Sequence, residues 1–70
     1  MRYKVEIERE TDGRWIAEVP ELPGVIVYGD TRADAVKNVE ALALRVIADR
    51  LEHGEVPVGP TISFAESAAE

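Results

Sequence analysis

The chain has no cysteine and only one histidine, His53, among its 70 residues. Without thiolates and with a single imidazole, it has no disulfide bond and lacks the ligand set of a typical transition-metal site. A domain of this length buries only about 60% of the surface that its unfolded chain exposes, so its stability is marginal. Association with another chain is the remaining way to add stability. We therefore expect a homo-oligomer, most simply a dimer.

The chain also lacks a long apolar run and a basic patch. Its longest apolar stretch, Pro23 to Tyr28, is far shorter than the ~20 residues that cross a bilayer. The charged N-terminus is unlike a signal peptide, so we expect a cytoplasmic protein. With 8 basic and 14 acidic residues the net charge is -6, which disfavours binding to phosphate backbones. An acidic protein suits a basic partner, although solubility alone is the simpler explanation of this charge.

Two segments near the N-terminus have the period-two pattern of strands. From Arg2 to Glu8 one face carries Tyr3, Val5 and Ile7, and from Arg14 to Val19 one face carries Trp15, Ala17 and Val19, opposite Ile16 and Glu18. The turn residues Asp12 and Gly13 lie between the segments, which predicts an antiparallel hairpin.

An elbow with two prolines and a glycine, Pro20 to Gly24, ends the second strand. The apolar run from Val25 to Tyr28 predicts a third strand that is central or buried on both faces. We expect a short fourth strand over Thr61–Phe64 and a frayed tail over residues 65–70.

A capping-box pattern at Thr31 and a glycine at Gly54 predict a helix from Thr31 to about His53. Helical periodicity places one apolar stripe against the sheet; it comprises Ala35, Val36, Val39, Leu42, Ala43, Val46 and Ile47. Such a helix is about 33 Å long and overhangs strands of about 23 Å. A second stripe, Ala41, Leu44, Ala48 and Leu51, is the predicted oligomer interface, with an exposed sheet edge as the alternative.

These elements predict a single α+β domain over residues 1–70, with a core over about 2–57. Its order is β-β-β-α-β, with one long helix across a three- to four-stranded antiparallel sheet. No catalytic constellation is recognisable. His53 lies in the last helical turn, where a cation complements the helix dipole, and the aspartates fall in turns, caps and the wet helix face. We therefore predict no enzyme activity, no metal site and no cofactor.

Partner contacts are predicted at five residues in and around the elbow: Trp15, Glu18, Glu21, Leu22 and Tyr28. Glu21 and Leu22 are expected to project from the corner, and Trp15 and Tyr28 are aromatic side chains of the kind that anchor interfaces. The small core needs the same aromatics, and alternation favours the core for Trp15. The elbow itself is predicted to be mainly a structural corner and only secondarily a contact surface.

Several motifs resemble the N-terminal domain of HicB-family antitoxins. They are Asp12-Gly13-Arg14-Trp15, the run Ala17 to Gly24, Gly29-Asp30-Thr31, and the helix bearing Ala35 and Asn38. The resemblance covers roughly Tyr3 to Pro57. It implies a partial ribonuclease-H-like fold and a partner, a small basic RNA-cleaving toxin of the HicA type, which the protein binds and neutralises. Typical members also carry a C-terminal DNA-binding segment that has no counterpart up to Glu70, so direct DNA binding is not expected.

Two other functions stay open at this point. The first is an orphan oligomeric module, regulatory or binding a small ligand. The second is a metal-dependent nuclease, which is disfavoured because turns and caps account for most carboxylates.

Overall fold

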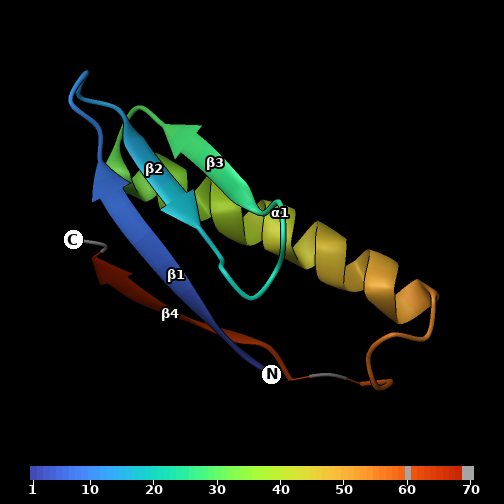
Figure 1. The fold of residues 1–70 in the computed structure, drawn as a ribbon. Helices are drawn as coiled ribbons and strands as arrows, with labels where there is room; N and C mark the ends of the chain where they lie inside the picture. Colours follow the sequence, from blue (N-terminus) through green and yellow to red (C-terminus); the bar gives the residue numbers. More distant parts are fainter. Residues whose placement is uncertain (60, 69–70) are drawn as a thin grey trace.

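The computed structural model describes residues 1–59 and 61–68. The elements follow in the order β1 (Arg2–Arg9), β2 (Trp15–Glu18), β3 (Ile26–Gly29), α1 (Arg32–Glu52) and β4 (Ser63–Ala68). The four strands form one sheet in the order β3-β2-β1-β4, and α1 lies behind it in the view of Figure 1. The predicted α+β class and the β-β-β-α-β order are confirmed.

The hairpin of β1 and β2 is confirmed as antiparallel, with Ile7 opposite Ala17. Gly13 lies in the turn of this hairpin with φ 92°, a backbone conformation that residues with a Cβ rarely adopt. The Gly13 N–H donates to the Glu10 carbonyl at 3.0 Å, and the Glu10 N–H donates to the Arg14 carbonyl at 2.7 Å.

The third strand is an edge strand, so its predicted central or doubly buried position is wrong. β3 pairs with β2 alone, antiparallel, with Ala17 opposite Val27. Val27 packs towards the core, whereas Ile26 and Tyr28 are each 47% exposed on the other face. An unbroken apolar run contains no alternation, and therefore does not reveal which of its side chains face solvent.

The fourth strand begins later than predicted and runs parallel to β1, so the sheet is mixed rather than antiparallel. Figure 1 shows why: α1 and the following connection return the chain to the end where β1 begins. The Ser63 N–H donates to the Met1 carbonyl at 2.9 Å, and the rings of Tyr3 and Phe64 lie 6.1 Å apart.

The expected frayed tail is wrong for residues 65–68, which belong to β4. They are held by the backbone ladder, where Ala65 lies opposite Lys4 and Glu66 opposite Val5. A parallel ladder stabilises a segment through main-chain hydrogen bonds, so low apolar content does not prevent order. Residues 69–70 lie outside the described part of the chain.

The helix begins as predicted. Thr31 is its N-cap, and its hydroxyl accepts a hydrogen bond from the Asp34 N–H at 3.0 Å. At the C-terminal end, the Gly54 N–H donates to the Leu51 carbonyl and the Glu55 N–H donates to the Arg50 carbonyl. Figure 1 shows the C-terminal half of α1 continuing beyond β2 and β3, which confirms the predicted overhang.

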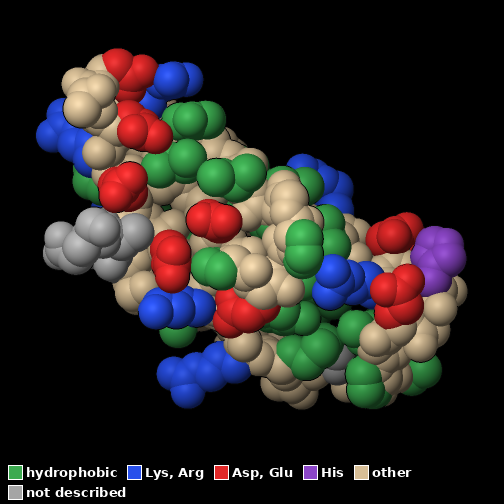
Figure 2. Space-filling view, in the orientation of Figure 1, with side chains coloured by type: hydrophobic (Ala, Val, Ile, Leu, Met, Phe, Trp, Pro, Cys, Tyr) green, Lys and Arg blue, Asp and Glu red, His purple; other side chains and the backbone are tan. Residues whose placement is uncertain are grey.

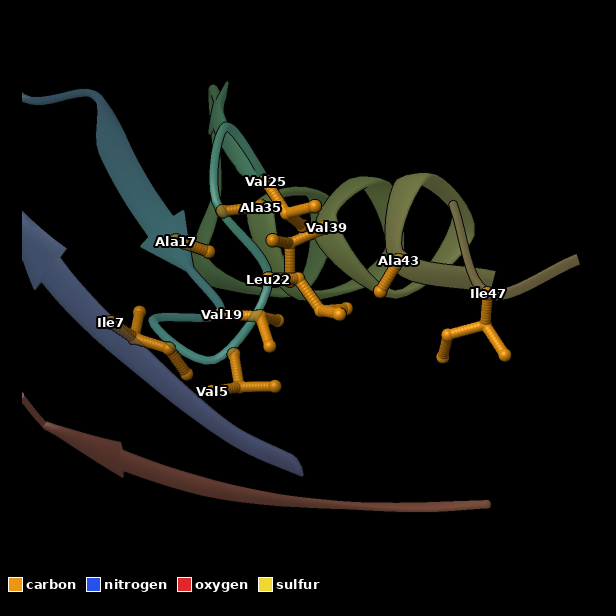
Figure 3. Close-up of a cluster of buried hydrophobic side chains, with 10 residues drawn as sticks. All are labelled: Val5, Ile7, Ala17, Val19, Leu22, Val25, Ala35, Val39, Ala43 and Ile47. Carbon is orange, nitrogen blue, oxygen red and sulfur yellow. The ribbon is translucent and has the colours of Figure 1, made fainter. Parts of the chain in front are cut away.

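The core lies between the sheet and α1 (Figure 3). Its helix side is the predicted stripe, of which Ala35, Val39, Ala43 and Ile47 are buried. From the strands and the elbow come the other six buried residues: Val5, Ile7, Ala17, Val19, Leu22 and Val25. Within the described ranges no helix has the length and apolar character needed to cross a membrane.

Candidate interaction surface

The face of the sheet that turns away from α1 carries no other element in the described part of the chain. Strand alternation places β1 residues Glu6 and Glu8 on this open face, because Val5 and Ile7 point to the core. From β2 and β3 it receives Ile16, Glu18, Ile26 and Tyr28. We call the set Glu6, Glu8, Ile16, Glu18, Ile26 and Tyr28 the β2–β3 face.

The apolar members of this face are neighbours across β2 and β3. Ile16 lies directly opposite Tyr28, and Ile26 lies opposite Glu18. A shallow groove of about 100 Å³ is lined by Glu6, Glu8, Ile16, Glu18 and Ile26. Figure 2 shows hydrophobic and acidic side chains interleaved over the part of the molecule where Figure 1 places β2 and β3. The face therefore combines exposed apolar surface with negative charge.

Two carboxylates of the face oppose each other directly. Glu6 and Glu18 are cross-strand partners in the ladder of β1 and β2, and like charges in that relation destabilise a sheet. Among the ion pairs of the described residues, none involves Glu6, Glu8 or Glu18. Their charge is therefore available to a cation from outside the chain.

At the border of the face, an arginine covers the ring of Tyr28. The Arg14 guanidinium carbon lies 4.4 Å from the ring centroid, a cation–π contact, while Arg14 Nε pairs with Asp12 Oδ2 at 2.8 Å. Hydrogen bonds from the Arg14 backbone N–H and its guanidinium lower the pKa of Asp12. The Asp12 carboxylate in turn raises the pKa of Arg14. Arg14 is thus held by Asp12 and Tyr28.

Leu22 does not project from the elbow, and its predicted role as a partner contact is wrong. Its side chain is 1% exposed and is part of the core. The Leu22 N–H donates to the Val19 carbonyl, and the Val25 N–H donates to the Leu22 carbonyl. This tight turn places the leucine under the sheet, where burial of its side chain is favourable. The elbow is accordingly a structural corner, as predicted.

The other predicted contact residues are divided between the two faces. Trp15 is half-buried and packs against the core, where Arg9 lies 5.9 Å from its ring, whereas Glu18 and Tyr28 belong to the open face. Glu21 is exposed, but its Oε2 accepts a hydrogen bond from the Lys4 backbone N–H at 3.2 Å. β2 ends before it reaches the part of β1 that contains Lys4. The Glu21 carboxylate therefore accepts a hydrogen bond from a backbone N–H that a longer β2 would have bonded.

Sequence reasoning missed Glu6, Glu8, Ile16 and Ile26 as members of the face. Alternation set Ile16 and Glu18 opposite the apolar face of their strand, and in the first strand it leaves Glu6 and Glu8 opposite Val5 and Ile7; this was the available signal. What the sequence did not reveal is the pairing that brings these strands together with Ile26.

The predicted oligomer stripe lies along the outer side of α1. Ala41 and Ala48 are exposed, Leu44 is 47% exposed and Leu51 is half-buried. The structure therefore leaves the stripe largely accessible.

Among residues 1–59 and 61–68, no group of three or more His, Asp or Glu side chains could hold a metal ion. His53 lies at the helix C-cap, where its Nδ1 is 2.7 Å from the Asp49 carbonyl oxygen. This bond and the nearby Asp49 carboxylate raise the pKa of His53. The contact is one that stabilises a helix end.

A separate polar cleft of about 450 Å³ lies between the end of β3 and the start of α1. It is lined by Arg14, Tyr28, Gly29, Asp30, Asp34, Lys37 and Asn38. Charges of both signs contribute to it, and the Asn38 side-chain amide donates to the Tyr28 carbonyl at 3.4 Å.

Comparison with known proteins identifies two relatives. The chain is 33% identical over 55 residues to UPF0150 protein Ta0767 of Thermoplasma acidophilum, an alignment that covers 79% of this chain and 80% of the relative. It is 39% identical over 56 residues to UPF0150 protein ssr1765 of Synechocystis, covering 79% and 71% of the two chains. No family model matches the chain, and no solved structure matches it significantly.

Proposed function

The chain belongs to the UPF0150 family, and for this member we propose a non-enzymatic function as a HicB-like antitoxin domain. In this proposal it binds a small basic toxin of the HicA type in the cytoplasm and neutralises it by covering the surface that acts on RNA. The resemblance of its elbow and helix-start motifs to HicB antitoxins supports the proposal. The single observation that carries it is the uncovered, acidic and apolar β2–β3 face.

The size of the molecule is compatible with neutralisation by occlusion. A stable protein complex buries about 800 Å² on each partner, and the chain has 4587 Å² of accessible surface. A contact of ordinary size therefore takes up less than about a fifth of this surface. An enzyme inhibited in this way loses access to its substrate, and no chemistry is required of the inhibitor.

Co-expression tests the proposal. The affinity-tagged chain is produced together with the products of its two neighbouring genes, and the captured complex is identified by mass. We expect capture of a short basic protein that contains a histidine and is toxic when expressed alone. Capture of nothing except copies of the chain would contradict the proposal.

We further propose that the chain forms a homodimer. The supporting observation is the accessible stripe of Ala41, Leu44, Ala48 and Leu51 on the overhanging helix, and small residues beside leucines let two helices approach closely. The exposed edge of β3 is the alternative contact.

A small-ligand function is the second candidate, and the polar cleft beside Asp30 and Lys37 favours it. A ligand that binds only the folded state raises its thermal stability. A screen of metabolites by thermal unfolding tests this candidate: a saturable rise in melting temperature that disappears in Lys37→Ala supports it, and no rise for any metabolite argues against it.

A further inference from the structure

We propose that the β2–β3 face is the docking surface for the basic partner, and that a lysine or arginine of the partner is received between Glu6 and Glu18. This inference rests on the proposed function and deepens it, because it assigns the surface and the chemistry of the contact. The occupant it commits to is a protein surface that carries positive side chains next to apolar ones.

Glu6 and Glu18 oppose each other across the ladder of β1 and β2. Their direct cross-strand relation is unfavourable in the free protein. Among ion pairs of the described residues, neither carboxylate takes part. A cation placed between them converts repulsion into two attractions, so the same pair that weakens the free sheet strengthens a complex with a positive partner.

Apolar surface lies beside these carboxylates. Ile26 is 47% exposed and lies directly opposite Glu18, and together with Ile16 it lines the groove that Glu6, Glu8 and Glu18 also line. Lysine and arginine have aliphatic stems that cover apolar surface while their charged ends remain among polar groups. The groove is lined by both kinds of side chain.

The cations in and next to the sheet have other neighbours. Arg14 is occupied by Asp12 and by the ring of Tyr28. The Arg9 guanidinium carbon lies 5.9 Å from the centroid of the Trp15 ring, which packs against the core. Arg2 and Lys4 precede Glu6 in β1 and belong to a different cleft, which Glu21 and Glu66 also line. The β2–β3 face is therefore complementary to positive charge, whereas the opposite end of the same sheet face is not.

The test compares two double variants with the same change in net charge. One is Glu6→Gln with Glu18→Gln, and the control is Glu40→Gln with Glu52→Gln on α1. An oligo-arginine peptide is titrated into isotopically labelled protein at about 150 mM salt, where the Debye length is about 8 Å. Binding is followed by amide chemical shifts, and stability is measured by urea unfolding.

We expect the peptide to shift amides of β2, of β3 and of the Glu6–Glu8 segment of β1. The face variant should bind about three- to tenfold more weakly and unfold at a higher urea concentration than the wild type. The α1 control should bind within about twofold of the wild type. Equal weakening of peptide binding by both double variants, or chemical-shift changes spread over the whole protein, would overturn the proposal. Net charge alone would then explain the binding.

Ile26→Lys tests the apolar part of the surface without removing a core side chain. It places a positive charge in the groove and should abolish the peptide shifts, while Leu44→Lys on α1 should preserve them. Unchanged peptide binding by Ile26→Lys would contradict the assignment of the groove.

The two proposals fail in distinguishable ways. If no neighbouring protein is captured but the peptide binds the β2–β3 face, the antitoxin function fails and the surface stands. If a basic neighbour is captured and its affinity is the same for the wild type, Glu6→Gln with Glu18→Gln, and Ile26→Lys, the function stands and the surface fails.

Discussion

Glu6 and Glu18 face each other across the antiparallel ladder of β1 and β2. Each lies on the solvent-exposed face of its own strand, and the register of the two strands makes them direct neighbours. Functional sites are where local rules of stability are most often broken, and this pair lies on the face that we propose as the docking surface.

Replacing one member of this pair by a cation should stabilise the free protein. Glu18→Lys creates an attractive cross-strand pair with Glu6 and should raise the free energy of unfolding by about 0.5–1 kcal/mol. Glu55→Lys has the same change in net charge, lies outside the sheet, and should change stability by less than about 0.5 kcal/mol. Urea unfolding measures both, and a loss of stability in Glu18→Lys would contradict the assigned register.

Leu22 should be required for folding rather than for binding. Leu22→Ala removes a core side chain that is 1% exposed and should cost about 2–5 kcal/mol. Glu21→Ala, one residue earlier on the same elbow, removes only the acceptor of the Lys4 N–H and should cost less than about 1.5 kcal/mol. Chemical unfolding of the two variants checks the order, which would be reversed if the elbow presented Leu22 to solvent.

Gly29 should not tolerate a side chain, because the start of α1 lies directly against it. A Cβ at this position would lie 2.8 Å from the Ala35 Cα and 2.9 Å from the Asp34 carbonyl carbon, both backbone atoms that cannot rotate away. We expect Gly29→Ala to cost about 1–3 kcal/mol through overpacking.

The control for this substitution is Gly54→Ala. That glycine has open space but a φ of 72°, so its replacement carries a conformational cost of about 1–2 kcal/mol without a clash. Circular dichroism during thermal unfolding measures the loss of stability in both variants. An unchanged melting temperature for Gly29→Ala would show that α1 does not approach β3 as described.

His53 should titrate above its usual pKa of 6.5. The hydrogen bond to the Asp49 backbone carbonyl and the Asp49 carboxylate both favour the protonated ring. Because the pKa is higher in the folded than in the unfolded state, the stabilisation is complete below pH 6.5 and is lost as pH rises through the folded pKa. NMR titration of the ring protons measures this shift.

The matched variant for the titration is Asp49→Asn, which keeps the backbone acceptor and removes the charge. Its His53 pKa should fall between those of the wild-type protein and an unfolded peptide. A wild-type His53 pKa at or below that of the peptide would contradict the C-cap contact.

The proposed dimer should depend on the outer side of α1. Leu44→Asp places a charge in the stripe of Ala41, Leu44, Ala48 and Leu51 and should convert a dimer into a monomer at micromolar concentration. Glu40→Asp, a neighbouring change outside the stripe, should leave the dimer intact. Light scattering gives the mass of each, and a monomeric wild type would refute the proposal.

The sequence predicted those strands and that helix in which one face is buried and the other is exposed to solvent. Alternation in β1 identified Val5 and Ile7 as core residues, and helical periodicity identified Ala35 and Val39, because burial of one face imposes a period on the residues. The capping residue Thr31 was recognisable because its side chain satisfies a specific orphan N–H group.

The parts that could not be predicted depend on pairing between distant segments. The direction of β4 follows from where α1 returns the chain, and its residues Ala65 to Ser67 have little apolar character. The edge position of β3 leaves Ile26 exposed although the local sequence is uniformly apolar. The candidate surface was the least predictable part, because it forms only when β1, β2 and β3 pair side by side.

The central claim is that this chain neutralises a basic RNA-cleaving partner by covering it. The most direct measurement is cleavage of a labelled RNA by the captured partner at fixed concentration while the chain is added in increasing amounts. We predict a linear loss of cleavage that reaches completion near equimolar chain, because occlusion is stoichiometric, and a shallower titration with Ile26→Lys. Undiminished cleavage at a large excess of folded chain would contradict the account.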